Sequence, residues 1–291
     1  MNLKDKTQNV PLVTKASGEQ EPFDENKLHE SLRRSGASQD AIGHILAHLR
    51  GEVRDGMPTR DIYRHAYVLL KKIGHPLAAK YSLKRAIFDF GPSGYAFESY
   101  VAELLKAQGY EIALRVGVPG FCVEHEIDVI GKKDNRHILV ECKFHNQSGM
   151  KSDIKAALYV QARFVDIKKR WEQEPEHLQE YHEAWFVTNT KVTHDAIRYS
   201  QCIGMKILSW NYPAGGGLRE LIESTSLHPV TCLTSLTRAQ KISLLEQNFV
   251  LARQLVDRPN ILGTIGLTGG RAERVINESA GIIKLGINYN A

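Results

Sequence analysis

The feature that most constrains this 291-residue chain is the stretch "HEIDVIGKKDNRHILVECKF", residues 125–144. It predicts two strands, around Glu126–Ile130 and His137–Phe144, joined by a polar turn. Asp128 and Glu141 fall inside runs that are otherwise apolar. Burying a carboxylate is costly unless something pairs with it. Either this face of the sheet is solvated, or something bound there requires the charges.

The two predicted strands place these charges together. Because side chains alternate along a strand, we expect Ile127 and Val129 to share one face and Asp128 to point to the other. If the strands pair as a hairpin, Asp128 and Glu141 converge near one end, with Lys143 beside them. Two close carboxylates repel each other unless a cation lies between them. A small set of oxygen ligands suits Mg²⁺, and a nearby lysine can stabilise charge that develops on a phosphate.

A plain alternative is an exposed Glu-x-Lys pair on a solvated strand. The order of the motifs favours the site instead, because the acidic helix "FESYVAELLKAQGYEI" with Glu98 precedes the Asp128 strand and the "ECK" strand. Residues 95–210 resemble the PD-(D/E)xK nucleases, and among them the Mrr-like restriction endonucleases. Asp128 matches the motif aspartate, and Glu141 and Lys143 match its Glu-x-Lys.

The resemblance implies a role for each matching residue. Asp128 and Glu141 would be ligands of Mg²⁺ (or Mn²⁺), and Lys143 would position the attacking water or stabilise the transition state. Glu98 would be a further acid near the metal, directly or through water, and Gln161 a weaker candidate for support. The implied protein is a metal-dependent endodeoxyribonuclease of the type IV, Mrr-like kind, acting in restriction of foreign DNA or in DNA repair.

The N-terminal part begins with "VTKASGEQEPFDENKLHESL". This stretch predicts a hairpin that turns at Ser17-Gly18, followed by a helix that Asp24 caps and a hydrophobic staple between Phe23 and Leu28. Further helices are predicted from Ser38, from Thr59 and over 76–88.

The segment from about 10 to 92 resembles the ATP-cone, a nucleotide-binding regulatory module. The resemblance implies that ATP or dATP binds as a regulatory ligand, with Ala16 standing where the family usually has a second basic residue. Strand residues facing a helix N-terminus fit phosphate binding. No GxxxxGK[ST] loop occurs, so nucleotide is expected to be sensed rather than hydrolysed. The alternative is an ordinary capped helix with surface lysines. The implied nucleotide-site residues are Val13, Lys15, Glu21, Asp24, Lys27 and Thr59.

The C-terminal part is predicted to be helical, with helices from Thr237, near 251–256, and as a pair within "ILGTIGLTGGRAERVINES". The pair resembles a helix-hairpin-helix, which would make Arg271 and Arg274 contacts to DNA phosphates. A helical cap with a glycine turn is the alternative. Lys191, in the loop "TNTK" after a buried strand, is a further candidate DNA contact, although a plain turn explains it equally well.

Composition narrows the class of protein. The chain is 42% hydrophobic and 24% charged with a net charge of +5, and basic residues prevail at both ends. This distribution would suit a polyanionic partner such as DNA, and an ordinary soluble surface explains it about as well. No signal peptide and no membrane span are expected, and a cytoplasmic protein is the expectation. The four cysteines form no Cys-x-x-Cys or Cys/His cluster, so no zinc site is expected. His125, His137 and His145 are scattered singly and receive no role.

The predicted fold is α/β. Residues 1–9 would be a tail, 10–93 a mostly helical ATP-cone with a small hairpin, 94–225 a restriction-endonuclease-like α/β/α sheet domain, and 226–291 a small helical region that contacts DNA. The alternative function is a non-catalytic, nucleotide-responsive DNA-binding regulator. A homo-oligomer is expected, because cutting both strands usually takes two active sites.

Overall fold

The computed structural model describes residues 10–177 and 180–287, which divide into two compact units. The first unit ends at Ser82 and the second begins at Leu83. This division lies before the boundary expected at residue 93. The reason is that Ile87 and Phe90, like Leu83, pack in the hydrophobic core of the second unit.

The first unit is a short hairpin followed by helices: β1 (Leu12–Thr14), β2 (Gln20–Pro22), α1 (Glu25–Arg34), α2 (Gln39–Arg50), α3 (Thr59–Ile73) and α4 (His75–Tyr81). The hairpin turns where Gly18 has a φ of +85°, a conformation that glycine adopts without strain.

The start of α1 has the cap that the sequence predicts. The Asp24 carboxylate accepts hydrogen bonds from the backbone N–H groups of Asn26 and Lys27, at 3.0 and 3.2 Å. Phe23 and Leu28 pack in the same core, as a hydrophobic staple requires. The single helix predicted over 76–88 is wrong. The helix α4 ends at Tyr81, and the next helix belongs to the second unit.

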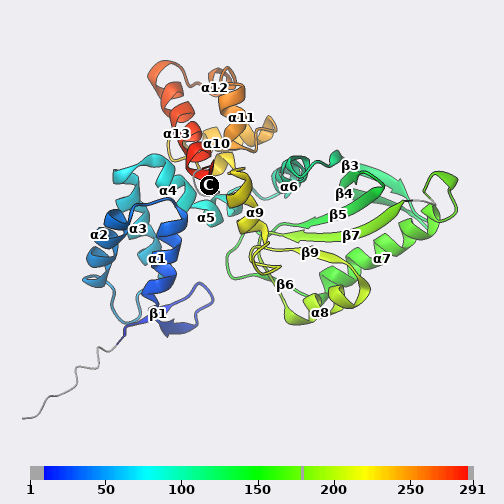
Figure 1. Ribbon diagram of the computed structural model, residues 1–291, viewed down its shortest axis with the longest axis horizontal. Coiled ribbons are helices and arrows are strands. Elements are labelled where there is room, and N and C mark those ends of the chain that lie inside the picture. The colour runs from blue at the N-terminus through cyan, green and yellow to red at the C-terminus, as the bar shows by residue number, and fades with distance from the viewer. Residues whose placement is uncertain (1–9, 178–179, 288–291) are drawn as a thin grey trace, which may run out of the picture. The chain divides into compact units, whose positions relative to one another are not determined.

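The second unit is built on a five-stranded sheet in the order β3-β4-β5-β7-β9 (Figure 1). The first three strands run antiparallel, and β5, β7 and β9 are parallel. The strands are β3 (Glu111–Pro119), β4 (Glu124–Lys133), β5 (Arg136–Lys143), β7 (Tyr181–Thr188) and β9 (Lys206–Leu208). A separate two-stranded parallel sheet joins β6 (Lys151–Ser152) to β8 (Lys191–Val192).

Helices cover both faces of this sheet, so the predicted layered α/β domain is present. The helices α6 (Tyr95–Ala107) and α9 (Leu218–Thr225) pack on one face. The helices α7 (Ile154–Trp171) and α8 (His194–Ile203) pack on the other. A short helix, α5 (Leu83–Phe88), and a 3₁₀ turn, η1 (Pro175–His177), complete this part of the unit.

Strand β3 was not predicted. Next to it, the side chains of β4 do not follow the expected alternation between the two faces of the sheet. Arg115 in β3 has a φ of 51°, in the left-handed region that only a few non-glycine residues adopt. Opposite this point, Ile127 packs with the α7 side of the sheet, whereas Val129 packs with the α6 side. The expectation that Ile127 and Val129 share a face is therefore wrong, because the regular alternation of side chains is interrupted between these two residues.

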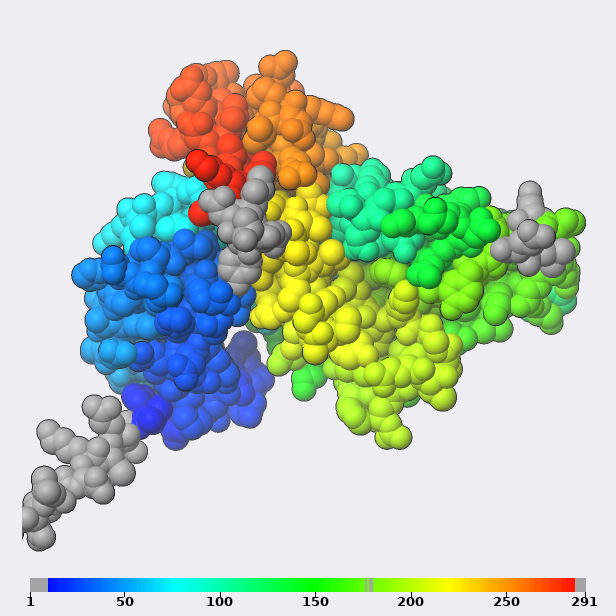
Figure 2. All heavy atoms as spheres, in the orientation of Figure 1, coloured from blue at the N-terminus to red at the C-terminus, as the bar shows by residue number. Residues whose placement is uncertain are grey.

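The C-terminal helices belong to the second unit, and the last of them contacts α9 (Figure 2). They are η2 (Val230–Cys232), α10 (Arg238–Glu246), α11 (Ala252–Asp257), α12 (Ile261–Thr264) and α13 (Gly269–Ile287). The buried Glu278 carboxylate on α13 accepts the backbone N–H groups of Thr234 and Ser235 at 2.6 and 2.9 Å. The Tyr100 hydroxyl donates to the Leu227 carbonyl at 2.7 Å, which joins this region to α6. Among the described helices, none has the length and apolar character that crossing a membrane requires.

Candidate active site

The predicted acids lie on three elements of the second unit: Glu98 on α6, Asp128 on β4 and Glu141 on β5. The last regular pair of the β4–β5 ladder is Val129 with Val140. One residue further along, Asp128 and Glu141 come opposite each other, as the hairpin prediction required.

Asp128 lies where this ladder stops. Its Oδ2 accepts the backbone N–H of Cys142 at 2.7 Å, a donor that ladder pairing would otherwise use. The carboxylate therefore stands between the two strands at the end of their pairing. Beyond this point β4 and β5 no longer pair with each other.

Two arginines that the sequence analysis did not identify form ion pairs with Glu98 and Glu141. Arg115 Nη1 donates to Glu98 Oε2 at 3.0 Å, and Arg163 Nη1 donates to Glu141 Oε2 at 2.6 Å. Arg163 also donates to the backbone carbonyl of Glu126. Arg163 lies on α7 two residues after Gln161, which the sequence offered only as a weaker candidate for support. A cation at that position has no distinct sequence signal, because basic residues are common on a helix such as "VQARFVDIKKRW".

The electrostatic environment of the three acids favours a proton or a cation. Burial, followed by the charge of Asp128, raises the pKa of Glu141 to about 7. Arg163 opposes this rise, and the charge of Glu98 adds to it. Burial also raises the pKa of Asp128, and it raises the pKa of Glu98 against the effect of the Arg115 hydrogen bond. The acids therefore act on one another, as a shared site requires.

The three carboxylates do not all gather at one point. Among the described residues, oxygens of Glu98, Asp128 and Glu141 do not come within 4.8 Å of one another as a set of three. Asp128 and Glu141 lie opposite each other where the β4–β5 ladder ends, whereas Glu98 is on α6. Lys143 is exposed at the end of β5, and its charge lowers the pKa of Glu141.

Further cations lie at this end of the sheet. Lys191 is exposed on β8, where it pairs in register with Lys151 of β6. Desolvation, followed by the charges of Lys191 and Arg219, lowers the pKa of Lys84. The loops after β5 and β7 are tied together because the backbone N–H of His145 donates to the Asn189 side chain at 2.9 Å. Lys191 is therefore on the same edge of the sheet as Lys143.

Most predicted nucleotide-site residues of the first unit come together. Lys15 Nζ lies 2.7 Å from Glu21 Oε2, and Lys27 Nζ lies 3.8 Å from the same oxygen. The Asp24 carboxylate is 3.7 Å from Lys27. A parallel bridge between Thr14 and Pro58 places Lys15, the next residue, near the start of α3 at Thr59.

Val13 differs from the other predicted nucleotide-site residues. It is 3% exposed and packs in the core of the first unit. Its side chain is therefore not open to a ligand, and a contact from Val13 would have to come from its backbone.

The predicted helix-hairpin-helix arginines, Arg271 and Arg274, are exposed near the start of α13. Gly266, in the turn before that helix, has a φ of +74°. The first helix of the pair, α12, spans only Ile261–Thr264.

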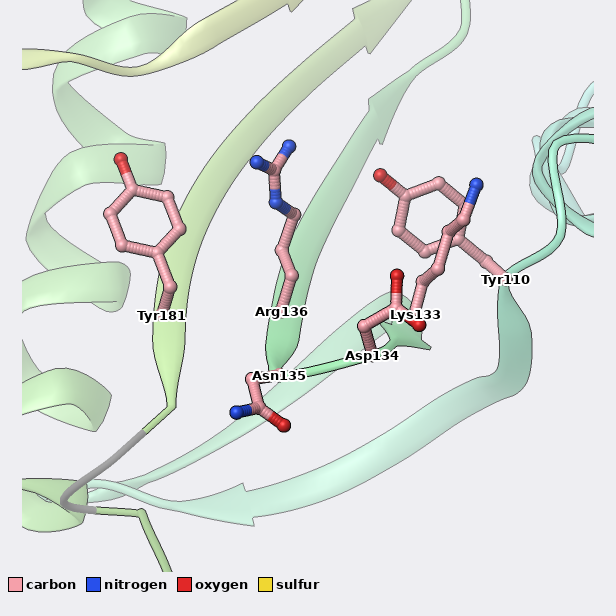
Figure 3. A pocket seen from close by; sticks show the side chains of 6 residues that line it. All are labelled: Tyr110, Lys133, Asp134, Asn135, Arg136 and Tyr181. Carbon is pink, nitrogen blue, oxygen red and sulfur yellow. The ribbon is translucent and has the colours of Figure 1, made fainter.

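A cavity of about 470 Å³ lies at the opposite end of the sheet, around the β4–β5 turn (Figure 3). It contains no predicted site residue. Its lining side chains belong to Tyr110, Lys133, Asp134, Asn135, Arg136 and Tyr181.

Comparisons with known proteins place the acids within a matched domain. Residues 92–211 match the family described as Restriction endonuclease (Mrr_cat), so the second unit carries a restriction-endonuclease-like nuclease domain. Residues 228–283 match the family described as AF1548-like, C-terminal. The first unit lies outside both matched segments.

Individual proteins are also similar to this chain. An uncharacterized protein of Archaeoglobus fulgidus is 35% identical over 184 residues, which is 63% of this chain and 99% of that protein. The crystal structure of AF1548, a protein of unknown function, is 34% identical with a TM-score of 0.54 and covers 65% of this chain and 98% of that one. The MspJI restriction endonuclease in complex with a 27-mer oligonucleotide is 14% identical with a TM-score of 0.35, over 69% of this chain and 39% of that one. The MspJI similarity is too low to define a fold or a ligand.

The Archaeoglobus protein aligns over almost its whole length, and both matched segments lie in the unit that contains the acids. The chain therefore belongs to the family of AF1548-like proteins, with a restriction-endonuclease-like domain at its centre.

Proposed function

We propose that this protein is a Mg²⁺-dependent DNA endonuclease that hydrolyses phosphodiester bonds in restriction of foreign DNA or in DNA repair. The observation that carries the proposal is the position of Asp128 opposite Glu141 where the β4–β5 ladder ends, within the matched domain. Three carboxylates beside two arginines leave one negative charge uncompensated within the chain, which a divalent cation would neutralise.

The donor set fits the proposed ion. Asp128 and Glu141 offer carboxylate oxygens, which suit Mg²⁺ or Mn²⁺. Each arginine of the site bonds only the Oε2 atom of its acid, so Oε1 of Glu141 stays open to a ligand among the described residues. When bound, such an ion supplies an acidified water and charge neutralisation at the phosphate.

The remaining residues have roles of their own. Lys143, exposed beside Glu141, would orient the attacking water or stabilise the charge that develops on the phosphate. Glu98 would hold a water at the edge of the site. The exposed Lys151 and Lys191 would contact the DNA backbone at the same end of the sheet.

One observation favours the alternative of a non-cleaving DNA-binding regulator. Arg115 and Arg163 already neutralise Glu98 and Glu141, so part of the acid site is compensated within the chain. Under this alternative the nuclease fold would be a docking surface for DNA, and the acids would be structural.

A plasmid-nicking assay separates the two functions. With Mg²⁺ we expect nicking that EDTA abolishes and that is lost in Asp128→Asn and Lys143→Ala, while both variants still bind DNA. Glu124→Gln is the matched control, because Glu124 is exposed on the same strand four residues from Asp128, and this variant should stay active. Absence of cleavage of any DNA with Mg²⁺ or Mn²⁺, with binding intact, would support the regulator.

We also propose that the first unit binds ATP or dATP as a regulatory ligand. The arrangement of Lys15 and Lys27 around Glu21, beside the start of α1, supports this role, because two cations near the positive end of a helix dipole attract an anion. Coupling to cleavage requires the nucleotide to favour one state of the protein over another.

Titration calorimetry with ATP, dATP and ADP tests nucleotide binding. Lys15→Ala should weaken binding roughly 10-fold, the loss of one charge-assisted contact. Lys72→Ala, an exposed lysine on α3, should leave binding unchanged. Equal binding by both variants, or no heat with any nucleotide, argues against an ATP-cone.

A further inference from the structure

A second cluster of metal-ligating side chains lies at the start of β5 and β7, away from the acids. Four residues each offer one ligand atom, and these atoms all lie within 4.8 Å of one another. The residues are His137, His177, Glu180 and His182. We propose that this histidine cluster is a structural site for a zinc-type divalent metal ion.

Strand pairing creates half of the histidine cluster. His137 on β5 and His182 on β7 are direct partners in the parallel ladder, so their side chains leave the sheet side by side on the same face. Figure 3 shows the pair that precedes them, Arg136 and Tyr181, on the same two strands. Because side chains alternate along a strand, His137 and His182 point to the opposite face, under α7.

The other two ligands come from the segment that follows α7. His177 ends the turn η1, and Glu180 directly precedes β7. His177 Nδ1 lies 2.6 Å from Glu180 Oε2, His137 Nε2 lies 3.2 Å from Glu180 Oε1, and His182 Nε2 lies 3.8 Å from Glu180 Oε2. Ligand atoms around a tetrahedral zinc ion are about 3.4 Å apart for bonds of about 2.0–2.1 Å. The spacings to the two Glu180 oxygens lie on either side of this value, and coordination would replace the hydrogen bond between His177 and Glu180.

Two of the ligand atoms lack hydrogen-bond partners. The Nε2 atoms of His137 and His182 are buried and make no hydrogen bond among the described residues. The side chain of His182 is only 6% exposed, so water does not readily satisfy it. A buried polar atom without a partner costs free energy, and coordination to a metal would remove this cost.

The surroundings close the site. The Trp171 ring stacks on His177 at 4.6 Å between centroids and lies 4.6 Å from His182. Lys132 Nζ contacts Glu180 Oε1 at 3.2 Å, which fixes the carboxylate from outside the cluster. Four protein ligands under an indole leave no open position for substrate, which is typical of structural rather than catalytic zinc. Three imidazoles and one carboxylate suit zinc better than Mg²⁺, which prefers oxygen ligands.

This histidine cluster is separate from the acid site. His137 and Glu141 lie on the same strand, four residues apart, which corresponds to ~13 Å along β5. The proposed metal would fasten the end of α7 to the start of the parallel strands, and the proposal does not depend on the nuclease function.

Metal analysis of tag-free protein, purified without chelators and desalted, tests the proposal. We expect about one zinc per chain by mass spectrometry, as a closed four-ligand site requires. Zinc should be lost from His137→Ala and from His182→Ala. His194→Ala is the control, because His194 is exposed on α8 outside the cluster, and this variant should keep the metal.

A measurement on the unaltered protein guards against variants that fail to fold. After zinc is stripped with dipicolinate, adding Co²⁺ should give the intense visible absorption of a tetrahedral site, and adding Zn²⁺ should bleach it and raise the melting temperature. Less than about one-tenth of a zinc per chain together with no cobalt spectrum overturns the proposal. Retention of zinc in both cluster variants overturns it as well.

Discussion

The two ends of strand β5 carry opposite solutions to the problem of buried polar groups. At one end Glu141 is half-buried beside Asp128 and Glu98, and burial, followed by the charge of Asp128, raises its pKa to about 7. At the other end the imidazoles of His137 and His182 are buried beside one carboxylate. The acid end lies where ladder pairing stops, whereas the histidine end lies within the ladder.

Because of this difference in strand pairing, the two ends of β5 are suited to different kinds of metal ion. An end where the strands separate can admit water, an ion and a phosphate, as chemistry on DNA requires. An end closed by Trp171 and fixed by strand register can hold an ion only as part of the fold. The same strand would thus present a hard-ion site for chemistry and a nitrogen-rich site for stability.

The largest expected effect is the loss of cleavage in Asp128→Asn. The change removes a carboxylate charge but keeps an oxygen that can accept from the Cys142 N–H, so the fold should survive. We expect Mg²⁺-dependent cleavage to fall roughly 10³-fold, because an ion that is not held supplies none of its several kcal/mol of transition-state stabilisation.

His137→Ala sharpens the first prediction. Because it alters the other end of the sheet, it should retain cleavage at temperatures where the protein stays folded. The two variants are compared by single-turnover rates at saturating Mg²⁺. Comparable losses in both would mean that the two ends do not have separate roles.

The next effect is the contribution of Glu141 to the dependence of stability on pH. The pKa of Glu141 rises from 4.5 to about 7 on folding, so the folded state binds the extra proton between these values. The contribution of Glu141 is therefore fullest below pH 4.5 and falls as the pH rises toward 7, by about 3 kcal/mol at most. His182 contributes in the opposite direction, because burial lowers its pKa to about 4. Mg²⁺ should recover this loss at pH 8 but have little effect at pH 5.

Melting temperatures measured from pH 5 to 8, with and without Mg²⁺, test this dependence. Glu141→Gln should remove the loss of stability between pH 5 and 7 and the gain from Mg²⁺, so that the difference between the unaltered protein and this variant changes with pH. A difference that is constant over this pH range would assign the titration to another group.

The sequence reveals the acid end because its signal is local. Asp128 and Glu141 lie on consecutive strands joined by a short turn, and each interrupts an apolar run. Period-two alternation and hairpin pairing therefore bring them together, and the order of the motifs indicates the domain. Glu98 could be added because it lies on the preceding amphipathic helix.

The histidine end could not be predicted because its signal is not local. His137 meets His182 only through parallel pairing across the intervening helix α7, and no spacing rule in the sequence fixes that register. The expectation of no zinc site rested on cysteines, which this cluster does not use. Strand β3 was missed for a related reason, because Gly117 and Pro119 and the left-handed Arg115 interrupt its pattern.

A third effect concerns zinc and stability. At a free zinc concentration 100-fold above the dissociation constant, the second unit should gain about 2.7 kcal/mol, or roughly 5–10 °C in melting temperature. Returning Mg²⁺ alone to stripped protein should restore cleavage without this gain. Calorimetry and nicking on the same sample measure both, and restoration of cleavage only by zinc would place the essential ion at the histidine end.

The smallest effect concerns Arg163, which links α7 to the acid end by donating to Glu141. In Arg163→Ala the Glu141 carboxylate loses its cation within the chain, so an added ion should replace that charge. We expect Mg²⁺ to bind about 5-fold more tightly, a difference of about 1 kcal/mol, while zinc binding stays unchanged. Arg170→Ala is the control, since Arg170 on the same helix pairs with Glu174 instead. Titration calorimetry at pH 8 measures Mg²⁺ binding by both variants. Weaker Mg²⁺ binding in Arg163→Ala would contradict the prediction and would show that Arg163 orients Glu141 for the ion instead of occupying the place of a cation.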